Sequence, residues 1–101
     1  MNKIPISFKL FASEYKVEID NKTNDAKGNL GHALVDLKKI VLADKVGIDD
    51  LPEDTVLDTY YHELVHCILL AMEERQLTKN EKFVDLFGKL LRQYLETVKF
   101  E

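Results

Sequence analysis

The chain has 101 residues, of which 46% are hydrophobic and 32% are charged, a composition that is ordinary for one soluble globular domain spanning residues 1–101. Its net charge of −4 argues against nucleic-acid binding as the main role, because surfaces that bind nucleic acid are basic. No apolar run is long enough to cross a membrane, and the N-terminus does not resemble a signal peptide.

The first half of the chain predicts a small antiparallel sheet. Apolar residues alternate with polar ones in two runs between Ile4 and Ile19, and further strands are expected at Leu30–Val35 and Ile40–Ala43. The polar segments between and after these runs predict a loop at 20–31, a turn at 36–39 and a second loop at 44–51.

Two helices are expected in the second half. Pro52 suits a first helical turn, and the apolar pattern then continues to about Glu74 or Arg75. A capping box with Thr78 as the N-cap predicts a last helix that runs to about Lys99. The short connection predicts antiparallel packing of the two helices. The expected fold class is therefore α+β, a small antiparallel β-sheet followed by two helices.

The first helix contains the pentapeptide His62-Glu63-Leu64-Val65-His66. Residues four apart share one face of a helix, so His62 and His66 can direct two imidazoles at one metal ion. Glu63 lies about 100° round the helix, at the edge of that face. This pattern is typical of a zinc site with two histidine ligands and a glutamate that acts as general base.

A catalytic zinc ion takes three protein ligands, and the downstream carboxylates supply the candidates. The His-Glu-x-x-His pentapeptide followed by Asn80-Glu81 and Asp85 resembles the gluzincin arrangement of zincin metallopeptidases. The order of elements is also similar to that of ImmA/IrrE-type peptidases and of minimal metallopeptidase-like proteins encoded by phages. The resemblance implies that Glu81 is the third ligand of Zn²⁺ and that Asp85 orients a ligand histidine.

The activity implied is zinc-dependent hydrolysis of a peptide or protein substrate, with Glu63 as the general base for a zinc-activated water. The expected compartment is the cytoplasm, which for a phage-encoded protein is that of the bacterial host. A single cysteine, Cys67, rules out an intrachain disulfide and fits a reducing compartment. No nucleic-acid or membrane partner is expected, and the sequence does not indicate an oligomeric state.

Three alternatives stay open from the residues alone. Glu81 has a plain structural role if it completes the capping box, and it lies level with His66 only if the first helix ends near Met72. Asp85, one helical turn further along the chain, is the alternative candidate for the third ligand. The chain could also be a zinc-binding interaction module without turnover, or a helical domain without metal. The charges at Lys89, Arg92, Glu96 and Lys99 are interpreted as a solvent-exposed face.

Overall fold

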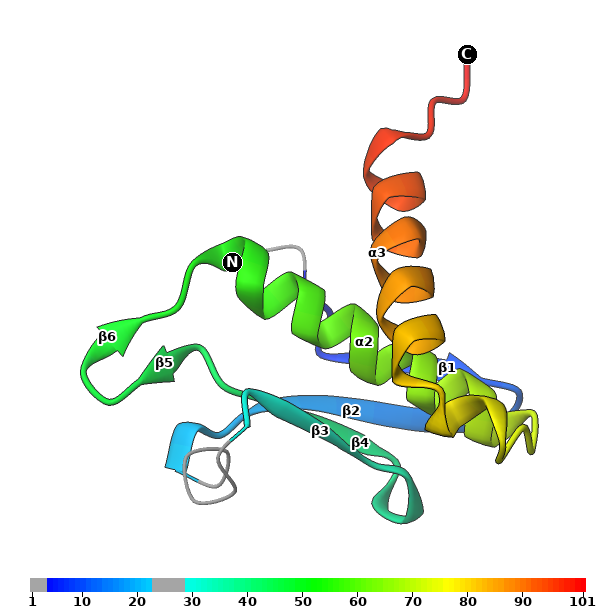
Figure 1. The fold of residues 1–101 in the computed structure, drawn as a ribbon, viewed down its shortest axis with the longest axis horizontal. Coiled ribbons are helices and arrows are strands. Elements are labelled where there is room, and N and C mark those ends of the chain that lie inside the picture. The colour runs from blue at the N-terminus through cyan, green and yellow to red at the C-terminus, as the bar shows by residue number, and fades with distance from the viewer. Residues whose placement is uncertain (1–3, 23–28) are drawn as a thin grey trace.

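The computed structural model of the chain describes residues 4–22 and 29–101 (Figure 1). The predicted loop at 20–31 therefore falls partly outside the described residues. The described part is an α+β fold with a sheet followed by two packed helices, as the sequence predicts; the sheet has four strands, and a small two-stranded hairpin lies between it and the helices. Within these residues, neither helix is long and apolar enough to cross a membrane.

The main sheet has the strand order β1-β2-β4-β3. Its strands are β1 (Ser7–Leu10), β2 (Ser13–Ile19), β3 (Gly31–Leu34) and β4 (Lys39–Leu42). The pairs β1–β2 and β3–β4 are antiparallel, but β2 and β4 run parallel, so the expectation of a purely antiparallel sheet is wrong. Parallel neighbours require a crossover connection, and here the chain passes through β3 at the sheet edge before it returns as β4.

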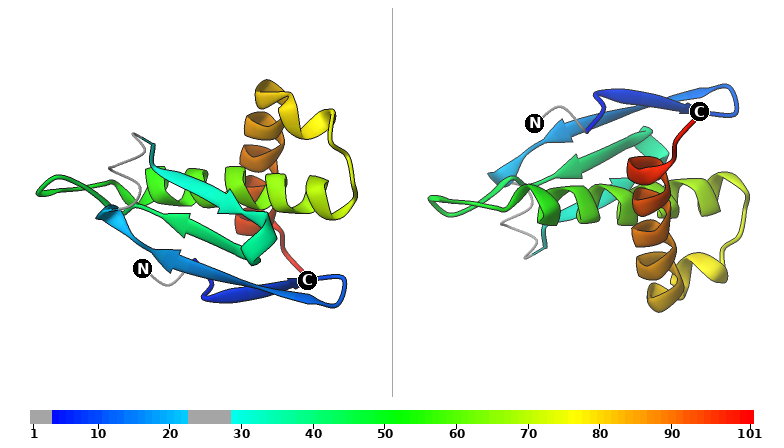
Figure 2. Two further views of the ribbon diagram at one scale, coloured as in Figure 1. Left: turned by 90° about the horizontal axis from the view of Figure 1, so that it is seen from below. Right: turned by 90° about the horizontal axis from the view of Figure 1, so that it is seen from above.

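Helix α2 (Glu53–Ala71) lies across one face of this sheet (Figure 2). The core between them consists of Tyr15, Ile40 and Leu42 from the strands and Val56, Tyr60 and Cys67 from the helix, all 4% exposed or less. A Cβ atom on Gly31 of β3 would lie 2.6 Å from Cγ2 of Thr59 on α2, so only glycine allows this close approach. The edge strand β3 is thereby held directly against the helix that carries the pentapeptide.

Helix α2 ends at Ala71, one turn earlier than the apolar pattern predicts. Glu73 adopts the left-handed conformation with φ of 60°, and the N–H groups of Glu73 and Glu74 donate to the carbonyls of Leu70 and Leu69. These two bonds are the Schellman arrangement that terminates helices, usually with glycine at the left-handed position. The sequence carried no glycine signal there, which is why the predicted end was too late.

The start of helix α3 (Glu81–Thr97) also differs from the prediction. The N-cap is Asn80, whose side-chain oxygen accepts from the N–H of Phe83 at 3.1 Å. Thr78 instead lies in the 3-10 helix η2 (Leu77–Lys79), so the predicted capping box does not form. Glu81 is therefore not used as a capping residue, and its carboxylate is directed elsewhere.

The two helices cross steeply instead of packing as an antiparallel hairpin (Figures 1 and 2). At the crossing, a Cβ atom on Gly88 would lie 3.2 Å from the backbone carbonyl of Tyr61. Arg92 binds the carboxylates of Asp54 and Asp58 on α2, and also Glu96, with only 15% of its side chain exposed. The expectation of a solvated charged face is thus wrong at Arg92, which joins the two helices.

The predicted loop at 44–51 forms a projecting hairpin of two short strands, β5 (Lys45–Val46) and β6 (Asp49–Asp50) (Figure 1). Gly47 at its tip has φ of +62°, the conformation that such tight turns require. The side chains of Asn21 and Asp44 are hydrogen-bonded at 2.9 Å, which ties the base of the hairpin to the end of β2.

Candidate metal centre

The two motif histidines lie on one face of α2, one turn apart, as their spacing predicts. Their ring centroids are 5.0 Å apart, and both side chains are largely buried, with 25% of His62 and 17% of His66 exposed. Burial lowers the pKa of His66, and the nearby carboxylate of Glu81 opposes that shift. A neutral imidazole is the form that binds a metal ion.

Glu81 brings a carboxylate to both imidazoles from the first turn of α3. Its Oε1 lies 3.0 Å from Nε2 of His62, and its Oε2 lies 3.5 Å from Nε2 of His66. One ligand atom from each of the three residues lies within 4.8 Å of the others. His62, His66 and Glu81 thus form a cluster that could hold a metal ion.

The separations in this cluster fit a tetrahedral zinc site. Ligand atoms that lie at about 2.0–2.1 Å from one ion at tetrahedral angles are about 3.3 Å apart. The distances from Glu81 to the two histidines, which involve different oxygens of the carboxylate, lie close to that value. Two imidazoles and one carboxylate are also a ligand set found in catalytic zinc sites, where the fourth position is left to water. The residues present therefore fit Zn²⁺.

Each histidine has a polar neighbour at its other ring nitrogen. Nδ1 of His66 is hydrogen-bonded to Oγ1 of Thr78 at 2.7 Å, and Nδ1 of His62 lies 3.6 Å from the carboxylate of Asp85. A partner at Nδ1 favours the tautomer in which Nε2 keeps its lone pair for a metal. Asp85 thus lies beside the cluster, next to His62, instead of within it.

Sequence reasoning missed Thr78 as a residue of this site. Its position in the chain indicated a helix cap, and no local pattern connects it with His66, twelve residues earlier. The contact exists because α2 ends at Ala71 and the connection folds back along the helix. The early helix end is also what brings Glu81 level with His66.

Glu63 lies outside the cluster but close to it. Burial raises the pKa of its carboxyl group, and the nearby Glu81 adds to that rise, while the proximity of His62 and a hydrogen bond from the backbone N–H of Ala33 act in the opposite direction. The Ala33 bond connects α2 with the edge strand β3. Glu63 is therefore held in one orientation without being part of the group that could bind the metal.

A cleft of about 350 Å³ opens beside the centre, lined by Gly31, Thr59, His62, Glu63 and Asp85 among others. One wall is β3, the edge strand of the sheet. The carbonyl of Leu30 accepts from the N–H of Ala43, so alternate residues along β3 face β4 and the intervening ones face the open edge. By this alternation, the backbone groups of Gly31 and Ala33 face the open edge, where Gly31 lines the cleft.

Cys67 is completely buried, and burial raises the pKa of its thiol to about 12. It is thus a core residue, as the apolar run around it predicts.

Comparison of the chain with protein-family models, with curated proteins and with solved structures gives no significant match. The arguments about function therefore depend on the site itself, which is a candidate metal centre made of two histidines and one glutamate.

Proposed function

We propose that the protein is a zinc-dependent metallopeptidase in which His62, His66 and Glu81 bind Zn²⁺ and Glu63 is the general base. The observation that carries the proposal is the position of Glu63, which lines the same cleft as His62 and accepts the N–H of Ala33 on the edge strand. A purely structural zinc site has no use for an oriented carboxylate beside its ligands, and it is usually closed by a fourth protein ligand.

The chain's own residues divide the chemistry among them. Zn²⁺, when bound, lowers the pKa of a water molecule to about 7. The Glu63 carboxylate takes a proton from the attacking water and passes it to the amine nitrogen of the leaving product. Asp85 and Thr78 keep the two imidazoles in the orientation that directs Nε2 toward Glu81.

The edge strand is the element that would hold a peptide substrate. An extended peptide can add to the open side of β3, with main-chain hydrogen bonds to Gly31 and to the carbonyl of Ala33, whose N–H is already bound by Glu63. The close contact between Gly31 and Thr59 keeps this edge directly beside the helix that carries Glu63. A scissile peptide bond bound there would lie next to the candidate metal centre.

The test compares the wild type with Glu63→Gln, each loaded with Zn²⁺ and each treated with a chelator, on a mixed peptide library read by mass spectrometry. Glutamine keeps the size of the side chain but cannot accept the proton at neutral pH. We expect equal zinc content in both proteins and cleavage only by the zinc-loaded wild type. Glu74→Gln, the same change at an exposed position on the connection, is the matched control and should cleave normally.

Two outcomes would count against the proposal. Cleavage by Glu63→Gln at the wild-type rate would remove Glu63 from the role of general base. Absence of cleavage by every protein, together with a peptide or protein ligand retained equally by the wild type and Glu63→Gln, would favour a zinc-binding interaction module without turnover.

A further inference from the structure

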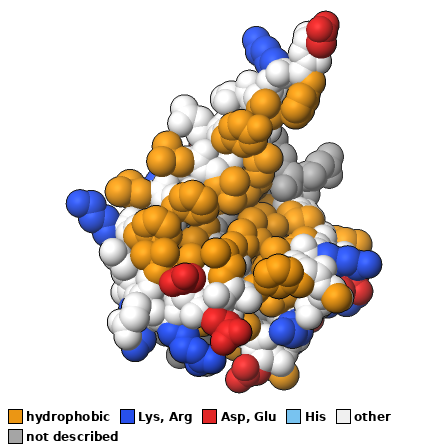
Figure 3. Space-filling model, turned by 90° about the vertical axis from the view of Figure 1, so that its right-hand side faces the viewer, with side chains coloured by type: hydrophobic (Ala, Val, Ile, Leu, Met, Phe, Trp, Pro, Cys, Tyr) orange, Lys and Arg blue, Asp and Glu red, His pale blue; other side chains and the backbone are white. Residues whose placement is uncertain are grey.

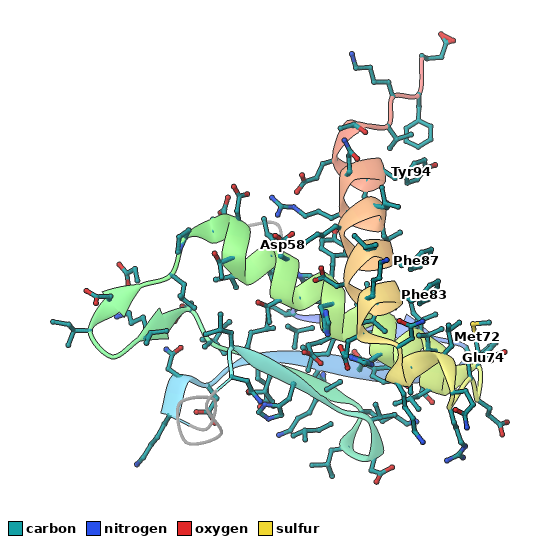
Figure 4. All side chains as sticks on the ribbon, viewed as in Figure 1. Asp58, Met72, Glu74, Phe83, Phe87 and Tyr94 are labelled. Carbon is teal, nitrogen blue, oxygen red and sulfur yellow. The ribbon has the colours of Figure 1, made fainter. Side chains whose placement is uncertain are left out.

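Helix α3 presents a stripe of apolar residues that its contact with α2 leaves largely exposed. The stripe consists of Phe83, Leu86, Phe87, Leu90 and Tyr94, which recur at helical spacing. Leu86, Phe87, Leu90 and Tyr94 are between 44% and 63% exposed. Phe83, Phe87 and Tyr94 lie on the same side of α3 (Figure 4), and Phe83 also packs against the buried cluster of Val65, Leu69 and Val84.

The packing of α3 uses only part of its apolar surface. Val84 and Gly88 are buried against α2, and both lie in the first half of the helix. Toward the C-terminus the helix projects away from the sheet and α2, and Leu95 is 51% exposed there (Figure 1). The apolar surface of α3 is therefore larger than the area that the rest of the described chain covers.

Seen from the right-hand side of the view in Figure 1, the exposed apolar residues form one nearly continuous patch (Figure 3). Phe83 and Phe87 stack within it, with their ring centroids 5.5 Å apart. Lys82 and Asn80 lie at one end, where together with Phe83, Leu86, Phe87 and Leu90 they line a shallow groove of about 340 Å³. The stripe positions themselves contain no charged residue, although 32% of the chain is charged.

We propose that the stripe on α3 is a dimer interface at which a second copy of this chain packs its own α3 in antiparallel orientation. A two-fold axis between Phe87 and Leu90 would place Phe83 of one copy against Tyr94 of the other, so that aromatic groups meet at both ends. Because no stripe residue is charged, this pairing brings no like charges together inside the interface. The proposal is independent of the metal centre and of its chemistry.

The area of the stripe matches what a small stable interface needs. An aromatic side chain contributes about 150–250 Å² when it is fully exposed, so the four stripe residues that are 44–63% exposed, together with the partly buried Phe83, leave on the order of 500 Å² open on each copy. Pairing two copies removes on the order of 1,000 Å² from the stripes alone. Exposed residues beside the stripe, such as Leu95, add to this area, and specific interfaces begin at about 1,200 Å². A dimer with a dissociation constant in the micromolar range is expected.

A second copy fits the stripe better than a charged partner does. A surface that recognises a basic or acidic partner presents the opposite charge within the contact, and the stripe presents none. Each chain carries a net charge of −4, so two copies repel each other weakly outside the interface, and added salt screens that repulsion. Association should therefore persist or strengthen as the salt concentration rises.

Sedimentation equilibrium of the full chain over about 1 μM to 1 mM, at low and high salt, tests the proposal. We expect a reversible monomer–dimer equilibrium for the wild type. Leu90→Glu should weaken it by about thirtyfold or more, since it places a charge at the centre of the interface. Ile48→Glu makes the same kind of change at a residue that is 96% exposed on the distant β5–β6 hairpin, and it should leave the equilibrium unchanged.

A second measurement guards against a variant that fails to fold. Far-ultraviolet circular dichroism should be the same for Leu90→Glu, Ile48→Glu and the wild type. In addition, Leu90→Cys should form a disulfide-linked dimer under mild oxidation, whereas Ile48→Cys should not, because only the former lies near the two-fold axis. A wild type that stays monomeric at the highest concentration would overturn the proposal, as would a dimer that Leu90→Glu does not weaken.

Discussion

Oγ1 of Thr78 lies 2.7 Å from Nδ1 of His66, and this contact joins the connection between the helices to the candidate metal centre. In the tautomer that carries its proton on Nδ1, the imidazole donates to this hydroxyl, and Nε2 of His66 is then available on the side of Glu81. The contact gives Thr78 a role in orienting His66, one of the three residues of the candidate centre, although Thr78 is not part of that group itself.

The first prediction follows from this contact. Thr78→Val keeps the shape of the side chain but removes the hydroxyl, so the imidazole loses its orienting partner. We expect zinc affinity to fall by about ten- to hundredfold, as is typical for such partners of a ligand histidine, while Thr78→Ser keeps most of the affinity. Competition with a chromophoric chelator measures the affinity. Thr97→Val, at the far end of α3, is the control; equal affinities for all four proteins would show that the contact does not matter for metal binding.

The second prediction distinguishes the roles of Glu81 and Asp85. Because Asn80 caps α3, Glu81→Gln should leave the stability of the metal-free protein nearly unchanged, and its effect on zinc binding can be read directly. We expect Glu81→Gln to weaken zinc binding far more than Asp85→Asn, whose effect should be about ten- to hundredfold. His62→Ala and His66→Ala should bind no zinc.

The same set of proteins should respond differently to metal removal. A chelator should lower the melting temperature of the zinc-loaded wild type, because the metal binds the folded state alone, and it should not change that of His62→Ala. Atomic absorption gives the zinc content, and calorimetry gives the melting temperature. If Asp85→Asn were the more damaging carboxylate change, the ligand role would pass from Glu81 to Asp85.

The third prediction concerns the turn that positions the site. Glu73 has a left-handed backbone conformation, which costs a residue with a Cβ atom about 1–2 kcal/mol and costs glycine little. Glu73→Gly should therefore raise the free energy of unfolding by about 0.5–1 kcal/mol and leave zinc affinity unchanged. Glu73→Ala removes the same charge but keeps Cβ, and it should not be stabilising. Urea denaturation compares the three proteins, and equal stabilities for the glycine and alanine variants would contradict the assignment of backbone strain.

Much of the fold and part of the site could be predicted because they depend on local periodicity. Alternation of apolar residues located the strands of the main sheet, and helical spacing placed His62 and His66 on one face of α2. The choice of Glu81 over Asp85 depended on a resemblance in the sequence. The structure now places Glu81 next to both imidazoles and Asp85 beside His62.

Other features required the tertiary structure, since they arise from contacts between distant segments. The parallel pairing of β2 with β4 depends on the path of β3, and the steep helix crossing depends on the close backbone contact at Gly88. The sequence alone indicates a surface charge at Arg92. Only the position of α3 across α2 brings Arg92 into contact with Asp54 and Asp58.

The sequence by itself determined that two histidines and a glutamate share one helix, because a helix fixes the relation between residues four apart whatever surrounds it. It did not determine where that helix ends. Glu73 takes a left-handed conformation for which the sequence has no glycine signal, and the tertiary structure alone shows this turn. The turn places Thr78 and Glu81 beside His66. The position of Glu81, the third residue of the candidate centre, therefore depends on the reversal of the chain after α2 and on the packing of α3.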